Sequence, residues 1–362
     1  MKHFEDDHHH NFENSALHVQ GGVEQPPVVN PYFKRKRRRE LSVDEYVEGI
    51  LSGSIVVLGQ AITLIESSLP EHKVMAQAII ERCIPYSGKS IRVGITGVPG
   101  AGKSTFIEAI GGKVVSEGRK LAVLAIDPSS QRSRGSILGD KTRMESLAHE
   151  PNVFIRPSPS GNSLGGVARK TRETMVVCEA AGFDTIFIET VGVGQSETAV
   201  HSMVDIFLML QISGAGDELQ GIKRGIMEMS DMIAITKADG SNIDKANLTK
   251  VQIKNALQLF PMPESGLRPQ VFTISSTEGY GLEELWAAIM EYLQTTQNFE
   301  GNRSRQSTYW MEETINEALL TGFYGSSDIK SALAAMRQRV INNELSPFQA
   351  AAQLLQRHEI ND

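Results

Sequence analysis

Residues 97–104 read G-V-P-G-A-G-K-S, so that three glycines, a lysine and a serine fall within eight residues. The segment matches the pattern G-x-x-x-x-G-K-S in full, directly after an apolar run and before a helical pattern. Glycines let backbone N–H groups turn inward around phosphate oxygens, and the N-terminus of the following helix attracts the same anion. The sequence therefore predicts a phosphate-binding loop made of Gly97, Val98, Pro99, Gly100, Ala101, Gly102, Lys103, Ser104 and Thr105.

Lys103 and Ser104 end this loop with two different chemical groups. In such loops the lysine ammonium contacts the β- and γ-phosphates of a nucleotide, and the serine hydroxyl coordinates Mg²⁺. Asp127 and Glu189 each close an apolar run, where a carboxylate is costly unless a cation or water lies beside it. We expect both to join the Mg²⁺ site, and Asp140 to join it when the γ-phosphate is present, with ordinary turn residues as the alternative for all three. Because no strong nucleophile stands beside a general base, the predicted reaction is attack of water on a phosphoryl group.

The segment T-K-A-D at 236–239 closes another apolar run, where a guanine-reading N-K-x-D element would lie. The Asp239 carboxylate can accept two hydrogen bonds from guanine N1–H and N2–H₂, a pair that adenine lacks. Lys237 would lie along the base, and the Thr236 hydroxyl can replace the loop-bracing amide of the usual asparagine. We therefore predict GTP and GDP as the nucleotides, with ATP as the less favoured alternative. A third base-contacting loop is predicted at the end of the next run, at Ser275, Ser276 and Thr277.

Near-continuous apolar runs alternate with helical patterns through the middle of the chain, which is typical of strands buried on both faces by helices. The sequence predicts an α/β fold with a doubly wound, mainly parallel sheet, and ligands of such sheets bind at the carboxyl ends of the strands. Every polar cluster described above lies at the end of such a run. The runs begin at Ile91 and cover 121–127, 185–190, 206–212, 232–239 and 271–275.

Helical patterns flank this central part. A capping box of Ser42 and Glu45 predicts the start of a helix that continues to Ser67, and a second helix is expected over 71–82. Another box, at Ser346, predicts the start of the last helix. The predicted organisation is a disordered tail at 1–40, N-terminal helices at 41–90, a P-loop domain at 91–295 and a C-terminal helical segment at 296–362.

Composition excludes several classes of protein. The net charge of −7 gives no general reason to expect nucleic-acid binding, although the basic run at 34–39 leaves an acidic or nucleic-acid partner as the alternative to a solvated segment. No apolar stretch is long enough to span a membrane. Cys83 and Cys178 form no C-x-x-C pair, and no secretory signal is present, so we expect a cytoplasmic protein.

Five long motifs follow one another in the chain, at residues 97–104, 125–144, 154–173, 189–197 and 216–239. In this order they resemble the MeaB/ArgK family of SIMIBI-class P-loop GTPases, which includes the methylmalonic aciduria type A protein. The similarity runs from about Tyr46 to Glu359. The resemblance implies a GTP-hydrolysing chaperone of an adenosylcobalamin-dependent acyl-CoA mutase, usually methylmalonyl-CoA mutase, that gates cofactor loading and protects the mutase. It also implies a homodimer in which the C-terminal helices are the dimerisation arm.

The resemblance also implies roles for single residues. Asp127, Asp140 and Glu189 match the family's Mg²⁺ and catalytic carboxylates. The segment D-E-L-Q-G-I-K at 217–223 matches a mobile segment that communicates the nucleotide state to the mutase. The catalytic candidates are therefore Lys103, Asp140, Glu189, Gln195, Gln220 and Lys223.

A metal-insertion GTPase of the nickel or zinc type is the alternative function within the same class. Such proteins place cysteine and histidine ligands near the nucleotide, whereas Cys83 and Cys178 are isolated in this sequence. An ATP-driven kinase or partitioning protein is a third possibility, which the carboxylate of Asp239 disfavours. An older transport label attached to the family has no support in these residues.

Overall fold

The computed structural model describes residues 41–126, 144–157, 164–190, 196–213, 224–263, 265–296 and 299–359. The predicted tail at 1–40 and its basic run therefore lie outside the described residues. The same holds for five of the predicted site residues, namely Asp127, Asp140, Gln195, Gln220 and Lys223.

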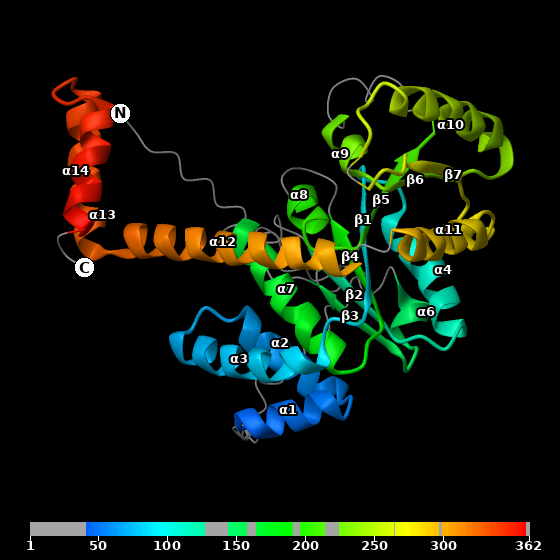
Figure 1. Ribbon diagram of the computed structural model, residues 1–362, viewed down its shortest axis with the longest axis horizontal. Helices are drawn as coiled ribbons and strands as arrows, with labels where there is room; N and C mark the ends of the chain where they lie inside the picture. Colours follow the sequence, from blue (N-terminus) through cyan, green and yellow to red (C-terminus); the bar gives the residue numbers. More distant parts are fainter. Residues whose placement is uncertain are drawn as a thin grey trace, which may run out of the picture. The chain divides into compact units, whose positions relative to one another are not determined.

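Seven strands in the described part of the chain form one parallel sheet with the order β3-β2-β4-β1-β5-β6-β7. Helices flank this sheet on both faces, as Figure 1 shows, so the predicted doubly wound α/β fold is confirmed. The strands are β1 (Ile91–Gly97), β2 (Leu121–Ile126), β3 (Val153–Pro157), β4 (Thr185–Thr190), β5 (Ile206–Ile212), β6 (Met232–Thr236) and β7 (Gln270–Thr273).

Strand β3 is the one that the apolar runs did not predict. It pairs only with β2, at the edge of the sheet, and it ends in Arg156 and Pro157, which are half-buried. Because an edge strand is covered on fewer sides, it does not need a continuous apolar run. Its short V-F-I core therefore gives a weaker signal than the runs of the central strands.

The winding of the sheet reverses beside β1. The chain leaves β1 for β2 on one side, returns to β4 next to β1, and then crosses to β5 on the other side. In open parallel sheets the crevice for ligands lies outside the carboxyl ends of the strands at such a reversal. The end of β1, where Gly97 lies opposite Leu210 of β5, is therefore the place where the fold favours a ligand.

Apolar side chains among the described residues pack helices against both faces of the sheet. On one face α4 and α11 pack against β1 and β5, through Phe106 and Trp286 among others. On the other face α10 packs against β5 and β6, with Ile253 and Ile233 both buried. The helices between the strands in the described residues are α4 (Lys103–Ser116), α6 (Glu145–Ala148), α7 (Leu164–Ala180), α8 (Ser196–His201), α9 (Arg224–Met229) and α10 (Ile243–Leu257). The helix α11 (Leu282–Thr295) follows the last of these strands.

The N-terminal helical region holds three helices where two were predicted. The capping box is present, since Glu45 N–H donates to Ser42 Oγ and Ser42 N–H donates to the Glu45 carboxylate. The predicted first helix breaks at Gly53, which has φ of 76°, and Ser54 then caps a new helix. Ile50 of the first helix and Leu58 of the second are both buried, so the two helices on either side of the break each contribute to the core. The helices are α1 (Val43–Leu51), α2 (Ile55–Glu66) and α3 (Pro70–Cys83).

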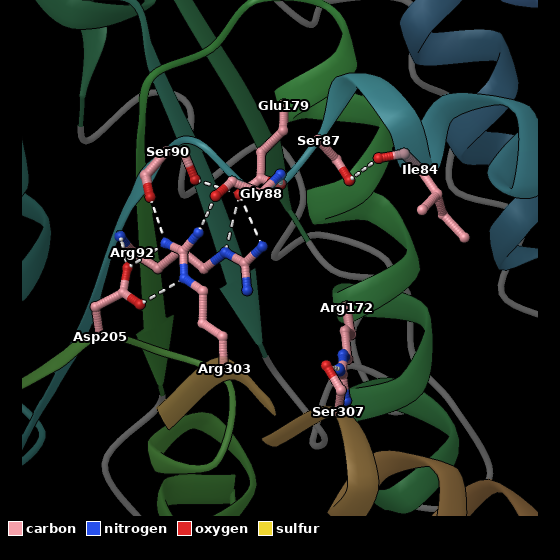
Figure 2. A network of polar contacts seen from close by, with 10 residues as sticks. All are labelled: Ile84, Ser87, Gly88, Ser90, Arg92, Arg172, Glu179, Asp205, Arg303 and Ser307. Atoms are coloured by element: carbon pink, nitrogen blue, oxygen red, sulfur yellow. Dashed lines mark hydrogen bonds and ion pairs between the residues drawn. The ribbon is translucent and has the colours of Figure 1, made fainter. Parts of the chain in front are cut away.

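The C-terminal helices begin at a buried polar network, drawn in Figure 2. Arg303 of α12 forms an ion pair with Asp205 at 2.8 Å and also donates to the carbonyl oxygens of Gly88 and Ser90. Further along α12, the Trp310 indole N–H donates to Ser202 O at 3.0 Å. These contacts fasten α12 to the segment between α8 and β5. The helices are α12 (Phe299–Gly325), α13 (Ser327–Ile341) and α14 (Pro347–Glu359).

Candidate nucleotide-binding site

The predicted phosphate loop connects the end of β1 to the start of α4. A Cβ atom added to Gly97 would lie 2.4 Å from the carbonyl oxygen of Leu210, so only glycine allows β1 and β5 to approach this closely here. Gly102 is the N-cap of α4 and has φ of 81°, a conformation that L-residues with side chains rarely adopt. The motif glycines are thus required by the backbone itself, and they direct the N-terminus of α4 toward the carboxyl edge of the sheet.

Lys103 lies in the first turn of α4, and its ammonium returns to the loop. Nζ donates to Gly97 O at 3.0 Å and to Val98 O at 3.5 Å. Burial lowers the pKa of Lys103, while the negative charges of Glu189 and Glu197 oppose that shift. The ammonium is therefore half-buried among weak carbonyl acceptors, and a phosphate oxygen would be a stronger partner for it.

Thr236, at the end of β6, braces the phosphate loop. Its hydroxyl is buried and donates to Ala101 O at 2.8 Å, with Gln211 O at 3.3 Å as a second acceptor. The hydroxyl thus supplies the brace that the missing asparagine amide would have supplied. As a result, the predicted base-reading segment and the predicted phosphate loop are joined by a direct hydrogen bond.

Asp239 lies half-buried beside the end of β7. Its Oδ2 accepts hydrogen bonds from Ser275 Oγ at 2.6 Å and from Thr277 Oγ1 at 3.4 Å. Lys237, between Thr236 and Asp239, is exposed and has a positive φ of 59°, which is uncommon for a residue with a side chain and is typical of functional loops. The structure therefore brings together the two segments that the sequence predicted to contact the base, with Ser276 half-buried between its neighbours.

Glu189 and Ser104 are the described members of the predicted Mg²⁺ set. Glu189 lies near the end of β4, between Ile95 of β1 and Ala125 of β2 in the register of the sheet. The next residue, Thr190, donates its hydroxyl to Thr96 Oγ1 at 3.0 Å and so ties the ends of β4 and β1 together. Ser104 follows Lys103 in the first turn of α4.

Three buried polar atoms in the described part of the chain have no hydrogen-bond partner: Glu197 Oε1, Gln211 Oε1 and Ser213 Oγ. Glu197 lies in the first turn of α8, the helix that comes after β4. Gln211 is near the end of β5, and Ser213 directly follows that strand. All three therefore lie at the carboxyl edge beside the phosphate loop. Unpaired buried oxygens are costly, so they indicate where a polar ligand or its water belongs.

These oxygens provide a test of whether the residues suit Mg²⁺. Hydroxyl and carboxylate oxygens are the donors that this ion prefers, and it usually keeps several waters that need acceptors. Ser104, Glu189 and the unpaired oxygens satisfy both requirements, so the described residues fit the ion. Among the same residues no group of three or more histidine, cysteine, aspartate or glutamate side chains forms a metal cluster.

The sequence prediction did not include Glu197, Gln211 and Ser213. Glu197 ends the motif E-T-V-G-V-G-Q-S-E, from which only Glu189 and Gln195 were chosen, so the motif itself was the available signal. A glutamate in the first turn of a helix usually faces solvent near the helix dipole. Its burial, with 1% of its surface exposed, depends on how α8 packs and is visible only in the structure.

The parallel sheet carries a G-x-x-x-x-G-K-S loop at the reversal of its winding, and Thr236 is hydrogen-bonded to that loop. These features define a P-loop protein. Comparisons with known proteins give the family. The model of the family described as methylmalonyl-CoA mutase-associated GTPase MeaB matches residues 58–328. The chain therefore belongs to the MeaB family, and it is a MeaB-family GTPase.

Similar proteins extend over most of the chain. A probable GTPase of Mycobacterium tuberculosis strain H37Rv is 45% identical over 324 residues, which cover 89% of this chain and 96% of that protein. The mitochondrial methylmalonic aciduria type A homolog of Mus musculus is 43% identical over 326 residues, covering 86% and 79% respectively. A crystal structure of an LAO/AO transport system kinase superposes with a TM-score of 0.71 at 36% identity, covering 89% of this chain and 99% of that one.

Proposed function

We propose that this protein hydrolyses GTP to GDP and phosphate, and that it uses this reaction to assist and protect an adenosylcobalamin-dependent acyl-CoA mutase by gating cofactor loading. Methylmalonyl-CoA mutase is the first candidate for the client, because the matching family model is described as associated with that enzyme. The observation that carries the choice of GTP is the position of Asp239, which accepts hydrogen bonds from hydroxyls of the segment after β7 and is close in the chain to Thr236, which bonds to the phosphate loop.

Binding of the nucleotide would use two ends of the site. The amides of residues 97–105, the N-terminus of α4 and the Lys103 ammonium would hold the phosphates. Asp239 would accept the two guanine N–H groups. The Ser275 and Thr277 hydroxyls that donate to its Oδ2 fix the direction of the carboxylate. A divalent cation at Ser104 and Glu189 would neutralise charge on the phosphate oxygens.

Hydrolysis would depend on how the attacking water and the terminal phosphate are positioned. Glu189 is the described member of the predicted catalytic carboxylates, and it lies beside the end of β1 in the sheet. We propose that it orients the attacking water, while Lys103 stabilises the negative charge that develops on the transferred phosphoryl group. Gln195, Gln220, Lys223, Asp127 and Asp140 stay candidates for the same step or for its coupling to the client.

A series of contacts leads from this site to the C-terminal helices, and it supports the proposal that hydrolysis is coupled to a partner protein. The helix α8 begins directly after Gln195. The segment that follows α8 holds α12, through Ser202 O with Trp310 and through Asp205 with Arg303. A displacement of α8 on hydrolysis would therefore reach the C-terminal helices, which is how nucleotide switches act on partners.

The proposed homodimer would use these C-terminal helices. Several large apolar side chains on α12, α13 and α14 are exposed, and Phe348 has 85% of its surface exposed. Exposed large apolar side chains gathered on the same helices are typical of a protein interface. The side chains are Met311, Ile315, Leu319, Leu320, Ile341, Phe348 and Leu355. Light scattering of the intact chain should give the mass of a dimer, and the mass of a monomer would contradict this part of the proposal.

The mutase assay tests the function as a whole. GTP hydrolysis is measured with the purified protein alone and with purified methylmalonyl-CoA mutase. We expect slow turnover that the mutase accelerates, with ethylmalonyl- and isobutyryl-CoA mutases as parallel samples. Hydrolysis without acceleration by any of the three would leave the GTPase in place but would remove the chaperone.

A further inference from the structure

The base-reading segment at 236–239 continues into a tight turn, a short 3₁₀ helix (Gly240–Asn242) that leads into α10. Lys237 has φ of 59° and Gly240 has φ of 49°, so the backbone enters the left-handed region on both sides of Asp239. Glycine adopts this conformation without strain, whereas a residue with a long side chain keeps it only where its surroundings hold it there. The conformation of Lys237 therefore needs a support.

Asn242 supplies a support of this kind. Its side-chain Nδ2 donates to Lys237 O at 2.6 Å, and its backbone N–H donates to Asp239 O at 2.9 Å. The side-chain donor has to be the amide nitrogen, because the carbonyl of Lys237 can only accept. Asn242 thus bonds to the residues on both sides of Ala238 and holds the backbone of the base-reading segment from the side of α10.

The position of Asn242 in the chain makes this use of its side chain informative. Asn242 is half-buried and is the N-cap of α10. The side chain of an N-cap asparagine usually accepts a hydrogen bond from a backbone N–H of the helix that it begins. Here no such bond is formed, and the amide instead donates back to Lys237. The side chain therefore supports the base-reading turn rather than the helix.

The segment after β7 holds the same backbone from the other side. Ala238 N–H donates to Ile274 O at 3.0 Å, and Ser275 Oγ donates to Asp239 Oδ2 at 2.6 Å. Both bonds require the chain at 237–239 to keep its course, because a change of φ at Lys237 would move Ala238 and Asp239 together. The direction of the Asp239 carboxylate thus depends on the left-handed turn before it.

We propose that Asn242 is a positioning residue for recognition of the base, which keeps Lys237 in its left-handed conformation and thereby keeps Asp239 where it meets guanine. Asn242 does not touch the nucleotide. Its role in recognition rests on the proposed function, whereas its bonds to the turn do not.

Amide hydrogen exchange tests the support without nucleotide. Exchange is measured by mass spectrometry on the natural chain and on Asn242→Ala, in the peptide that covers 237–243. Because the variant loses one hydrogen bond that holds the turn, we expect exchange in this peptide to become about fivefold faster or more. Asn247→Ala removes an exposed asparagine of α10 and is the matched control, which should leave the exchange unchanged. Unchanged exchange in Asn242→Ala would overturn the proposal.

Binding measurements test the role in recognition. Asn242→Ala should raise the Kd of GTP by about fivefold or more, and it should leave the Kd of inorganic tripolyphosphate, which has no base, within about twofold. A merely structural role would weaken the binding of both ligands or of neither. In the Lys237→Gly background, Asn242→Ala should change the Kd of GTP by less than about twofold, because glycine keeps the left-handed turn without support.

The outcomes separate this inference from the proposed function. An equal loss of affinity for GTP and tripolyphosphate, or an undiminished effect of Asn242→Ala in the Lys237→Gly background, would overturn the role in recognition. Failure of the natural chain to bind GTP would instead remove the proposed function, and hydrogen exchange would still decide whether Asn242 holds the turn.

Discussion

Replacing Asp239 by asparagine tests how the base is recognised. The change keeps the size of the side chain but removes its charge and one acceptor. In the structure Oδ2 accepts from Ser275 Oγ at 2.6 Å and from Thr277 Oγ1 at 3.4 Å. Hydroxyls can also accept, so the new amide N–H₂ can donate to them, and only the amide oxygen is left for guanine. One of the two guanine N–H groups then loses its partner.

The magnitude follows from the loss of one hydrogen bond to a charged group. Such a bond contributes about 1.5–3 kcal/mol, and each 1.4 kcal/mol is a factor of ten. GTP affinity should therefore fall by roughly 10- to 150-fold. Xanthosine triphosphate has a carbonyl where guanine has an amino group, so the Asp239→Asn variant should bind it more tightly than the natural chain does.

The assay is calorimetric titration of both proteins with GTP, xanthosine triphosphate and ATP in the presence of Mg²⁺. Asp244→Asn, an exposed carboxylate in the first turn of α10, is the matched control and should leave all three affinities unchanged. An unchanged affinity of Asp239→Asn for GTP would show that Asp239 does not contact the base. An equal loss in both variants would mean that the effect is general electrostatics.

Other predictions concern the supports of the site. Thr236→Ala leaves the buried Ala101 carbonyl without its donor, so it should destabilise the protein by about 1–3 kcal/mol and weaken GTP binding in thermal and binding assays, whereas Thr236→Ser should keep both. Arg303→Ala leaves the buried Asp205 carboxylate without its cation and should cost about 3–5 kcal/mol in urea unfolding; a loss below about 1 kcal/mol would mean that the pair behaves as a surface pair. Burial raises the pKa of Asp231, so the folded state favours its protonated form, and that stabilisation is lost as the pH rises from about 4 toward neutrality. The stability of the natural chain relative to Asp231→Asn should accordingly fall over this range, and a constant difference would contradict the shift.

The sequence was sufficient to predict the features that depend on local spacing. The apolar runs predicted six of the strands because central strands are buried on both faces, and the glycines of the phosphate loop are required by the backbone at the end of β1. The adjacency of residues 236–239 to 275–277 followed from the rule that parallel strands end at one edge, and the bond from Ser275 to Asp239 agrees with it.

What could not be predicted depends on contacts between distant residues. The ion pair of Arg303 with Asp205 joins positions 98 residues apart, and no local pattern marks it. The burial of Glu197 arises because α8 lies against Gly94, a glycine inside a strand whose role is to leave space for a helix. The break at Gly53 was missed because the apolar spacing continues across it, although the local turn then starts a new helix.

Calorimetric titration of the purified protein with Mg²⁺ and a non-hydrolysable GTP analogue tests the central claim most directly. We predict binding of one analogue molecule per chain, with the corresponding ATP analogue at least about 100-fold weaker because adenine cannot donate two hydrogen bonds to Asp239. Absence of heat from the GTP analogue, or equal affinity for the two analogues, would contradict a guanine-nucleotide site at this edge of the sheet.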